Sequence, residues 1–101
     1  MIILVGTNIT EAHPVAGTFV KDAVLAGAKL IVIDPRRTEM VDFADMHIQL
    51  KVGSDVALIN ALMNVLITEN LYDKKYVDSC TEGFEELKKK VMEYTPEKAE
   101  K

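Results

Sequence analysis

Polar and charged residues follow three apolar stretches of this 101-residue chain, and their types suit the binding of a nucleotide. Gly6-Thr7-Asn8 follows the first stretch, Asp34-Pro35-Arg36-Arg37 the second and Gly53-Ser54-Asp55 the third. Backbone N–H groups in a turn before a helix bind anions. A carboxylate accepts hydrogen bonds from ribose hydroxyls or from an amino-bearing base edge, and arginine clamps phosphate. These groups are suited to holding a ligand.

The residues needed for catalysis or for a metal site do not come together in the sequence. Cys80 is the single cysteine, so an intrachain disulfide or a cysteine cluster is excluded, and we expect Cys80 to be a half-buried structural thiol. His13 and His47 have no second ligand at metal-binding spacing. There is no pair of carboxylates for acid–base chemistry and no nucleophile beside a base. We therefore predict no catalytic residue and no metal ligand.

A parallel sheet is predicted to position the three loops. Ile2–Val5 and Leu30–Ile33 are unbroken apolar runs, typical of strands covered on both faces, and residues 14–27 carry apolar side chains at helical spacing. This strand–helix–strand order is a βαβ unit. Residues 46–51 alternate between apolar and polar, which predicts an edge or near-edge strand with His47 on the wet face. Carboxyl ends of parallel strands meet at one edge, so we expect one shared ligand.

The second half of the chain is predicted to be helical. Beyond a short helical turn over 38–43, we expect a helix over 55–69 with a single polar stripe, amphipathic helices over 73–80 and 82–93, and a helix start at Thr95-Pro96-Glu97. The fold class is α/β: a Rossmann-like parallel three-stranded sheet with helices and a helical C-terminal tail. We expect one partial domain over residues 1–101, with a β-α-β-β-α core at 1–70 and the helical tail at 71–101.

Three features favour a piece of a larger protein. The first strand is apolar on both faces, the helix over 55–69 is too apolar for a free surface, and the last helix is begun but not completed. With strands in the order three–two–one, the first strand needs a neighbour that this chain lacks. We expect the isolated chain to cover that edge by forming a homo-oligomer.

Charge and hydropathy limit the partners. The net charge is −4 and no basic stripe is present, which argues against binding to a nucleic-acid backbone. No apolar run is long enough to span a membrane, and no signal peptide is recognisable. The single cysteine favours a reducing compartment, so we expect a cytoplasmic protein.

Eight short motifs occur in one order along the chain. They are Gly6-Thr7-Asn8, Glu11-Ala12-His13-Pro14, Gly27-Ala28-Lys29, Ile33-Asp34-Pro35-Arg36-Arg37, Ala44-Asp45-Met46-His47, Gly53-Ser54-Asp55-Val56-Ala57-Leu58, Asn70-Leu71-Tyr72-Asp73 and Thr81-Glu82-Gly83-Phe84-Glu85. This order resembles the molybdopterin oxidoreductase family over essentially the whole chain. The last motif and Tyr94-Thr95-Pro96-Glu97 resemble in particular the catalytic (alpha) subunit of molybdenum- or tungsten-dependent formate dehydrogenases.

The resemblance implies that this segment binds a guanine dinucleotide arm of a bis-molybdopterin guanine dinucleotide (bis-MGD) cofactor. The implied pyrophosphate contacts are Gly6, Thr7, Asn8 and Glu11. The implied ribose and guanine contacts are Asp34, Pro35 and Arg36, and the pocket is completed by Gly53 and Asp55. Arg37 is a lower-ranked phosphate or interdomain contact.

The resemblance also implies what lies outside this segment. The parent protein would oxidise formate to carbon dioxide. Outside this segment it would carry a 4Fe-4S cluster, a cysteine or selenocysteine that ligates the metal, and a histidine next to that residue. Cys80 does not correspond to the metal-ligating cysteine or to a cysteine of the cluster. Implied partners are the remainder of the catalytic subunit and electron-transfer subunits.

Two other interpretations remain open from the residues alone. One is an NADP-type half-Rossmann module with Arg36 and Arg37 on the 2′-phosphate, against which the missing glycines of the dinucleotide fingerprint count. The other is the structural central domain of a thiamine-diphosphate enzyme, which the Gly53-Ser54-Asp55 turn does not suit.

Overall fold

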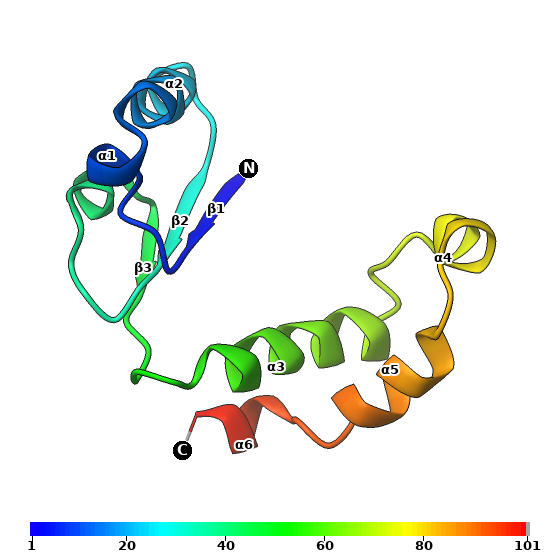
Figure 1. Cartoon of the computed structure of the whole chain (residues 1–101). Helices are drawn as coiled ribbons and strands as arrows, with labels where there is room; N and C mark the ends of the chain where they lie inside the picture. Colours follow the sequence, from blue (N-terminus) through cyan, green and yellow to red (C-terminus); the bar gives the residue numbers. More distant parts are fainter. Residues whose placement is uncertain (101) are drawn as a thin grey trace. The chain divides into compact units, whose positions relative to one another are not determined.

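A three-stranded parallel sheet lies at the centre of the first half of the chain (Figure 1). Its strands are β1 (Ile2–Val5), β2 (Leu30–Ile33) and β3 (Met46–Ile48), with β2 in the middle. Ile2 pairs with Leu30, and Ile31 pairs with Met46. The structure is a computed structural model and describes residues 1–100. The predicted α/β class, the parallel pairing and the edge position of the third strand are confirmed.

The chain divides into two compact units, one of residues 1–52 and one that begins at residue 53. The N-terminal unit contains the sheet, and the C-terminal unit is helical. The grouping of both into one domain with a core at 1–70 stays a prediction.

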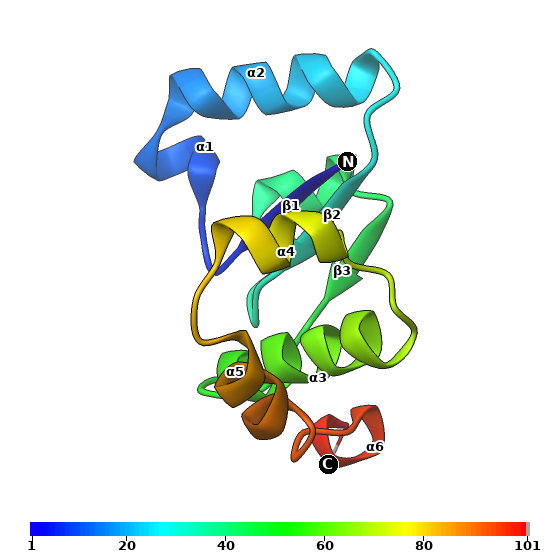
Figure 2. The same ribbon diagram turned by 90° about the vertical axis from the view of Figure 1, so that its right-hand side faces the viewer.

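One face of the sheet is covered by helices within the N-terminal unit. These are α1 (Ile9–Ala12), α2 (Pro14–Leu25) and the 3₁₀ helix η1 (Glu39–Phe43); Figure 2 shows α2 along its length with α1 at its N-terminal end. The core joins sheet and helices through five buried side chains, namely Leu4, Leu30, Val32, Met40 and Val41. The helix over 14–27 and the turn over 38–43 are confirmed, whereas α1 was not predicted.

The other face of the sheet is apolar and open within residues 1–52. Ile3, Val5 and Met46 are exposed there, with Met46 at 53%. Val32 pairs with His47, so His47 points to the helix-covered face and is half-buried. The expectation of cover on both faces is therefore wrong for β1, whose Ile3 and Val5 are exposed, whereas every residue of β2 is buried or half-buried as expected. The expectation that His47 faces water is wrong, because His47 lies on the face that the helices of this unit cover.

The C-terminal unit is built on α3 (Asp55–Thr68), which packs against α5 (Phe84–Val91) and α6 (Pro96–Ala99). The remaining helix of this unit, α4 (Lys74–Cys80), begins after Asp73, whose carboxylate accepts from the Tyr76 N–H at 3.0 Å (Figure 1). These bounds confirm the helices predicted over 55–69, 73–80 and 82–93. The predicted start at Thr95-Pro96-Glu97 is also confirmed.

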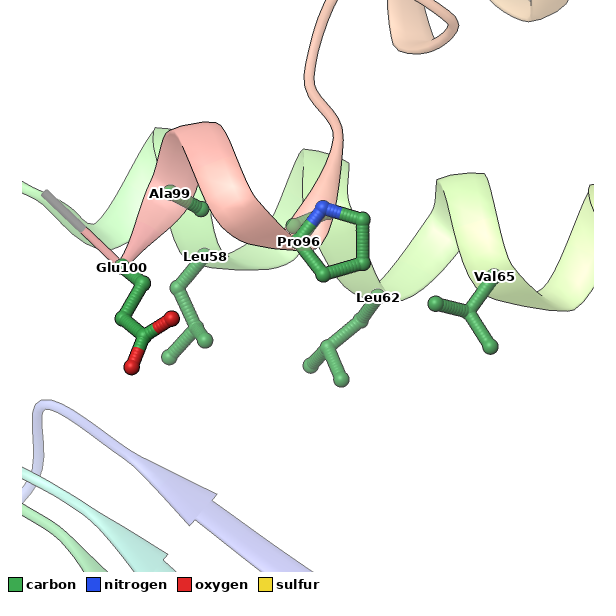
Figure 3. A pocket seen from close by; sticks show the side chains of 7 residues that line it. Leu58, Leu62, Val65, Pro96, Ala99 and Glu100 are labelled. Atoms are coloured by element: carbon green, nitrogen blue, oxygen red, sulfur yellow. The ribbon is translucent and has the colours of Figure 1, made fainter.

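The polar stripe of α3 is directed at another helix of its unit. Asn64 is buried, and its Nδ2 donates to the carbonyl oxygen of Val91 at the end of α5 (3.1 Å). Leu58, Leu62 and Val65 line a separate apolar groove beside Pro96 of α6 (Figure 3). Glu100 is the charged residue among those that line this groove, and the other lining residues are apolar.

Candidate functional site

The loop after β1 offers hydrogen-bond donors. Gly6 has φ +57°, which other residues adopt at a cost, and its N–H donates to the carbonyl oxygen of Ile33 (2.8 Å). Asn8 Oδ1 accepts from the Thr10 hydroxyl at 2.9 Å. Because the oxygen of the Asn8 amide is engaged, its NH₂ group remains as the donor, and such a donor suits phosphate or carbonyl oxygens.

The loop after β2 is organised by a buried carboxylate. Asp34 is 1% exposed, and its Oδ1 accepts from the backbone N–H of Arg36 (2.8 Å) and from Arg36 Nε (3.3 Å). The backbone N–H of Arg36, more than any other group, holds the pKa of Asp34 below its ordinary value of 3.8; the guanidinium acts in the same direction and burial acts against it. Asp34 and Arg36 therefore satisfy one another.

Two residues of the third strand region hold the same loop from the side. His47 Nε2 lies 2.9 Å from the carbonyl oxygen of Asp34, and Gln49 Nε2 donates to the carbonyl oxygen of Pro35 (2.9 Å). A carbonyl oxygen only accepts, so Nε2 of His47 carries the hydrogen. Sequence analysis missed both residues as part of the site. Their spacing of two, which places them on one face of a strand, was the available signal.

The first two loops lie within electrostatic reach of one another. The hydrogen bond to Asp34 and the Asp34 charge raise the pKa of Arg36 above its ordinary value, and the charge of Glu11 on α1 contributes to the same shift. Glu11 and Arg36 were both predicted site residues. The N-terminal unit thus places Glu11 near Arg36, and the Gly6 N–H joins the ends of β1 and β2 through its bond to Ile33.

The third predicted loop belongs to the C-terminal unit. Ser54 is the N-cap of α3 and Asp55 is the first residue of that helix, where an acidic side chain favours the helix dipole. Participation of Gly53 and Asp55 in the same site stays a prediction.

Other candidate residues lie in ordinary surroundings. Arg37 Nη2 pairs with Asp42 Oδ1 at 2.5 Å, and both side chains are exposed. Cys80 is exposed at the end of α4, so the expectation of a half-buried thiol is wrong. Within residues 1–100, no three His, Cys, Asp or Glu side chains are grouped so as to hold a metal ion.

A parallel α/β unit with amide and guanidinium donors after adjacent strands has the architecture of a Rossmann-like unit. Residues 1–94 match the family described as molybdopterin oxidoreductase. The chain belongs to the molybdopterin oxidoreductase family. This membership sets aside the NADP-type and thiamine-diphosphate alternatives.

Similar proteins carry several different names. Formate dehydrogenase H of Escherichia coli (strain K12) is 51% identical over 100 residues, which are 99% of this chain and 14% of that protein. The F420-dependent formate dehydrogenase subunit alpha of Methanocaldococcus jannaschii is 48% identical, with 99% and 15% covered. The solved structure of acetylene hydratase from Pelobacter acetylenicus matches with a TM-score of 0.86 and 42% identity, covering 96% of this chain and 14% of that one.

This chain therefore spans about one seventh of the length of the curated relatives it matches. In the part of the chain that the structure describes, no helix has the length and apolar character to cross a lipid bilayer.

Proposed function

We propose that this chain is a segment of a formate dehydrogenase-like molybdopterin oxidoreductase and that it binds a guanine dinucleotide arm of bis-MGD. The observation that carries the proposal is the meeting of the chain segments after β1 and β2, where the Gly6 N–H donates to the carbonyl oxygen of Ile33 (2.8 Å) and the Arg36 side chain lies near the charge of Glu11. Family membership supports a molybdopterin cofactor. A match shared by proteins named dehydrogenase and hydratase is expected of a segment that holds a cofactor.

The donor set of the N-terminal unit fits an anionic ligand. Gly6 presents no side chain, and nothing lies within 4 Å of the point where a Cβ would stand. The NH₂ group of Asn8 and the exposed guanidinium of Arg36 are donors that phosphate oxygens accept. We assign the pyrophosphate and its neighbouring groups to Gly6, Thr7, Asn8 and Glu11. The ribose and guanine side is assigned to Asp34, Pro35 and Arg36.

The guanine edge is assigned to the start of α3. Guanine presents N1–H and N2–H₂ donors side by side, and the carboxylate of Asp55 accepts both in one plane. Gly53 leaves room for the approach of the base. Asp55 is half-exposed in the C-terminal unit, as a ligand contact requires.

The parent protein, in this proposal, oxidises formate to carbon dioxide, and the molybdenum or tungsten cofactor supplies the two-electron redox chemistry when it is bound. The residues of this chain bind and orient one arm of that cofactor. Catalytic residues, the metal ligand and the 4Fe-4S cluster belong to the remainder of the catalytic subunit, which acts with electron-transfer subunits. The alpha-subunit names of several relatives support such an assembly. Identity of 51% to a formate dehydrogenase against 42% to acetylene hydratase favours formate.

Titration of the isotope-labelled chain with GDP and ADP, followed by backbone amide shifts, tests the binding assignment. We expect GDP to shift residues 6–11, 34–36 and 53–55, and ADP to bind more weakly. Affinity will be low, because this chain supplies only part of a cofactor pocket. Shifts produced by ADP alone would overturn the guanine assignment.

Asp55→Ala separates base recognition from helix stability. We expect this variant to weaken GDP binding about tenfold, the loss of one charge-assisted pair. The matched control is Asp73→Ala, which removes an acid from the start of α4 in the same unit. The control should lose about 1 kcal/mol of stability with unchanged GDP binding. Equal stability loss and unaltered GDP binding in Asp55→Ala would reduce Asp55 to a helix-dipole residue.

A further inference from the structure

Asp34 and Arg36, two of the three charged residues that follow β2, differ sharply in what they offer a ligand. The Asp34 side chain is 2% exposed, whereas that of Arg36 is 68% exposed. We propose that Arg36 is the group by which this loop contacts a phosphate of the cofactor arm, and that Asp34 is a positioning residue acting through Arg36. This inference rests on the proposed function and changes two of its assignments, since Asp34 and Arg36 were placed there on the ribose and guanine side, where an acid after such a strand is expected to meet the ribose.

The carboxylate of Asp34 is already committed inside its own loop. Its Oδ1 accepts from the Arg36 backbone N–H two residues ahead, which is an Asx turn, and also from Arg36 Nε. The first bond fixes where the Arg36 backbone lies, and the second fixes the direction in which its side chain leaves the loop. A single buried oxygen thus orients both parts of Arg36.

The backbone beneath this turn is held from β3. His47 and Gln49 donate to two successive carbonyl oxygens, those of Asp34 and Pro35, at 2.9 Å each. The backbone N–H of Asp34 itself donates to the carbonyl oxygen of Ile48 (3.3 Å). With its polar groups paired, the loop does not have to be ordered when the ligand arrives, and that lowers the entropic cost of binding.

Arg36 keeps most of its donors for a ligand. Within residues 1–100, Nε is the only guanidinium nitrogen of Arg36 that donates a hydrogen bond, so both Nη groups remain. A guanidinium fork in this state matches two phosphate oxygens. The neighbouring Arg37 provides a matched comparison, because it is equally exposed but its Nη2 is bound to the exposed carboxylate of Asp42.

The chain contains only two arginines, Arg36 and Arg37, so its guanidinium Nε–H groups give just two NMR signals. Without any ligand, we expect the Nε–H of Arg36 to exchange with water at least about tenfold more slowly than that of Arg37, since it is hydrogen-bonded to a buried carboxylate. Asp34→Asn should remove this protection. It keeps an oxygen acceptor for the Arg36 backbone N–H, so the turn should be retained and unfolding should stay cooperative, although the charge of Asp34 no longer adds to stability.

Titration with GDP and with guanosine then tests the division of roles. Arg36→Gln should weaken GDP about tenfold and leave guanosine unchanged, because the lost contact is to phosphate. Asp34→Asn should weaken GDP in the wild-type background and add nothing in the Arg36→Gln background. Arg37→Gln is the control and should bind both probes as the wild type does.

The outcomes separate this inference from the proposed function. Additive losses of GDP affinity in the double variant would show that Asp34 contacts the ligand directly. Equal losses of affinity for GDP and for guanosine in Arg36→Gln would show that Arg36 does not contact the phosphate. Either result overturns the inference and leaves the proposal of nucleotide binding intact. A wild-type chain that binds neither probe overturns the proposed function and the phosphate contact with it. The Nε–H signals still decide whether Asp34 positions Arg36, since equal exchange of the two arginines would refute it.

Discussion

Replacement of a buried glycine is predicted to strengthen the N-terminal unit. Gly17 lies in the fourth position of α2, where that helix passes close to α1. A Cβ built at this position would meet Thr10 Cα at 3.4 Å, the Ile9 carbonyl oxygen at 3.5 Å and Met40 Cε at 3.5 Å. These distances are ordinary van der Waals contacts, so an alanine fits without displacing a neighbour.

The expected gain for Gly17→Ala has two sources. Alanine is favoured over glycine in a helix interior by about 0.8–1.0 kcal/mol. A methyl group buried against Met40 adds a fraction of the roughly 0.8 kcal/mol assigned to one buried CH₂. We therefore expect the free energy of unfolding to rise by about 1–1.5 kcal/mol, which corresponds to a rise in Tm of several degrees for a domain of this size.

Urea unfolding followed by circular dichroism measures the change, with Gly27→Ala as the control. Gly27 has open space around its Cβ position, but its φ of +98° is unfavourable for alanine. The same substitution is therefore expected to cost about 1 kcal/mol there. The two variants should move the midpoint in opposite directions with unchanged m-values.

A Gly17→Ala variant that loses 1 kcal/mol or more would refute this reasoning. Such a loss would mean that α1 and α2 approach more closely than the three contact distances indicate, so that the added methyl group is overpacked. A gain at Gly27 would equally refute the role assigned to its backbone angle.

Two further predictions concern buried polar groups. Asn64→Ala should lower the free energy of unfolding by about 1–3 kcal/mol, because the carbonyl oxygen of Val91 loses its hydrogen-bond donor. The control Asn60→Ala, one helical turn earlier, should change the free energy of unfolding by less than about 0.5 kcal/mol. Urea unfolding of both variants measures the difference. The lowered pKa of Asp34 stabilises the fold above pH 3.8, and this contribution is lost as the pH falls through the lower native-state pKa. Unfolding curves of the wild type and Asp34→Asn between pH 6 and pH 2 should therefore converge on the acid side, and a constant difference would contradict the assignment.

The strands and the long helices were predictable because their signals are local and repeated. Ile2–Val5 and Leu30–Ile33 are continuous apolar runs that end at Gly6 and Asp34, and those end points also located two loops of the candidate site. The single turn of α1 was missed, because four residues cannot show a helical period.

The face on which β3 is buried was not predictable from alternation. The alternation places Met46 and His47 on opposite faces of β3 but does not say which face is buried. That depends on the side of the sheet on which α2 and η1 pack, which is a property of the tertiary fold. The burial of Asp34 was hidden for a similar reason. The same residues, Asp34-Pro35-Arg36, are compatible with an acid that faces a ligand and with an acid that accepts from the N–H two residues ahead. Only the structure distinguishes the two roles.

The register of the parallel sheet has a consequence for the order of folding. Ile2 can pair with Leu30 only after the chain through α1 and α2 closes, whereas Ile31 reaches Met46 across a loop about half as long. Doubling a loop costs about 0.6 kcal/mol of closure entropy. We therefore expect β2 and β3 to associate first, with β1 joining in a later and slower step whose rate depends on contacts distant in sequence.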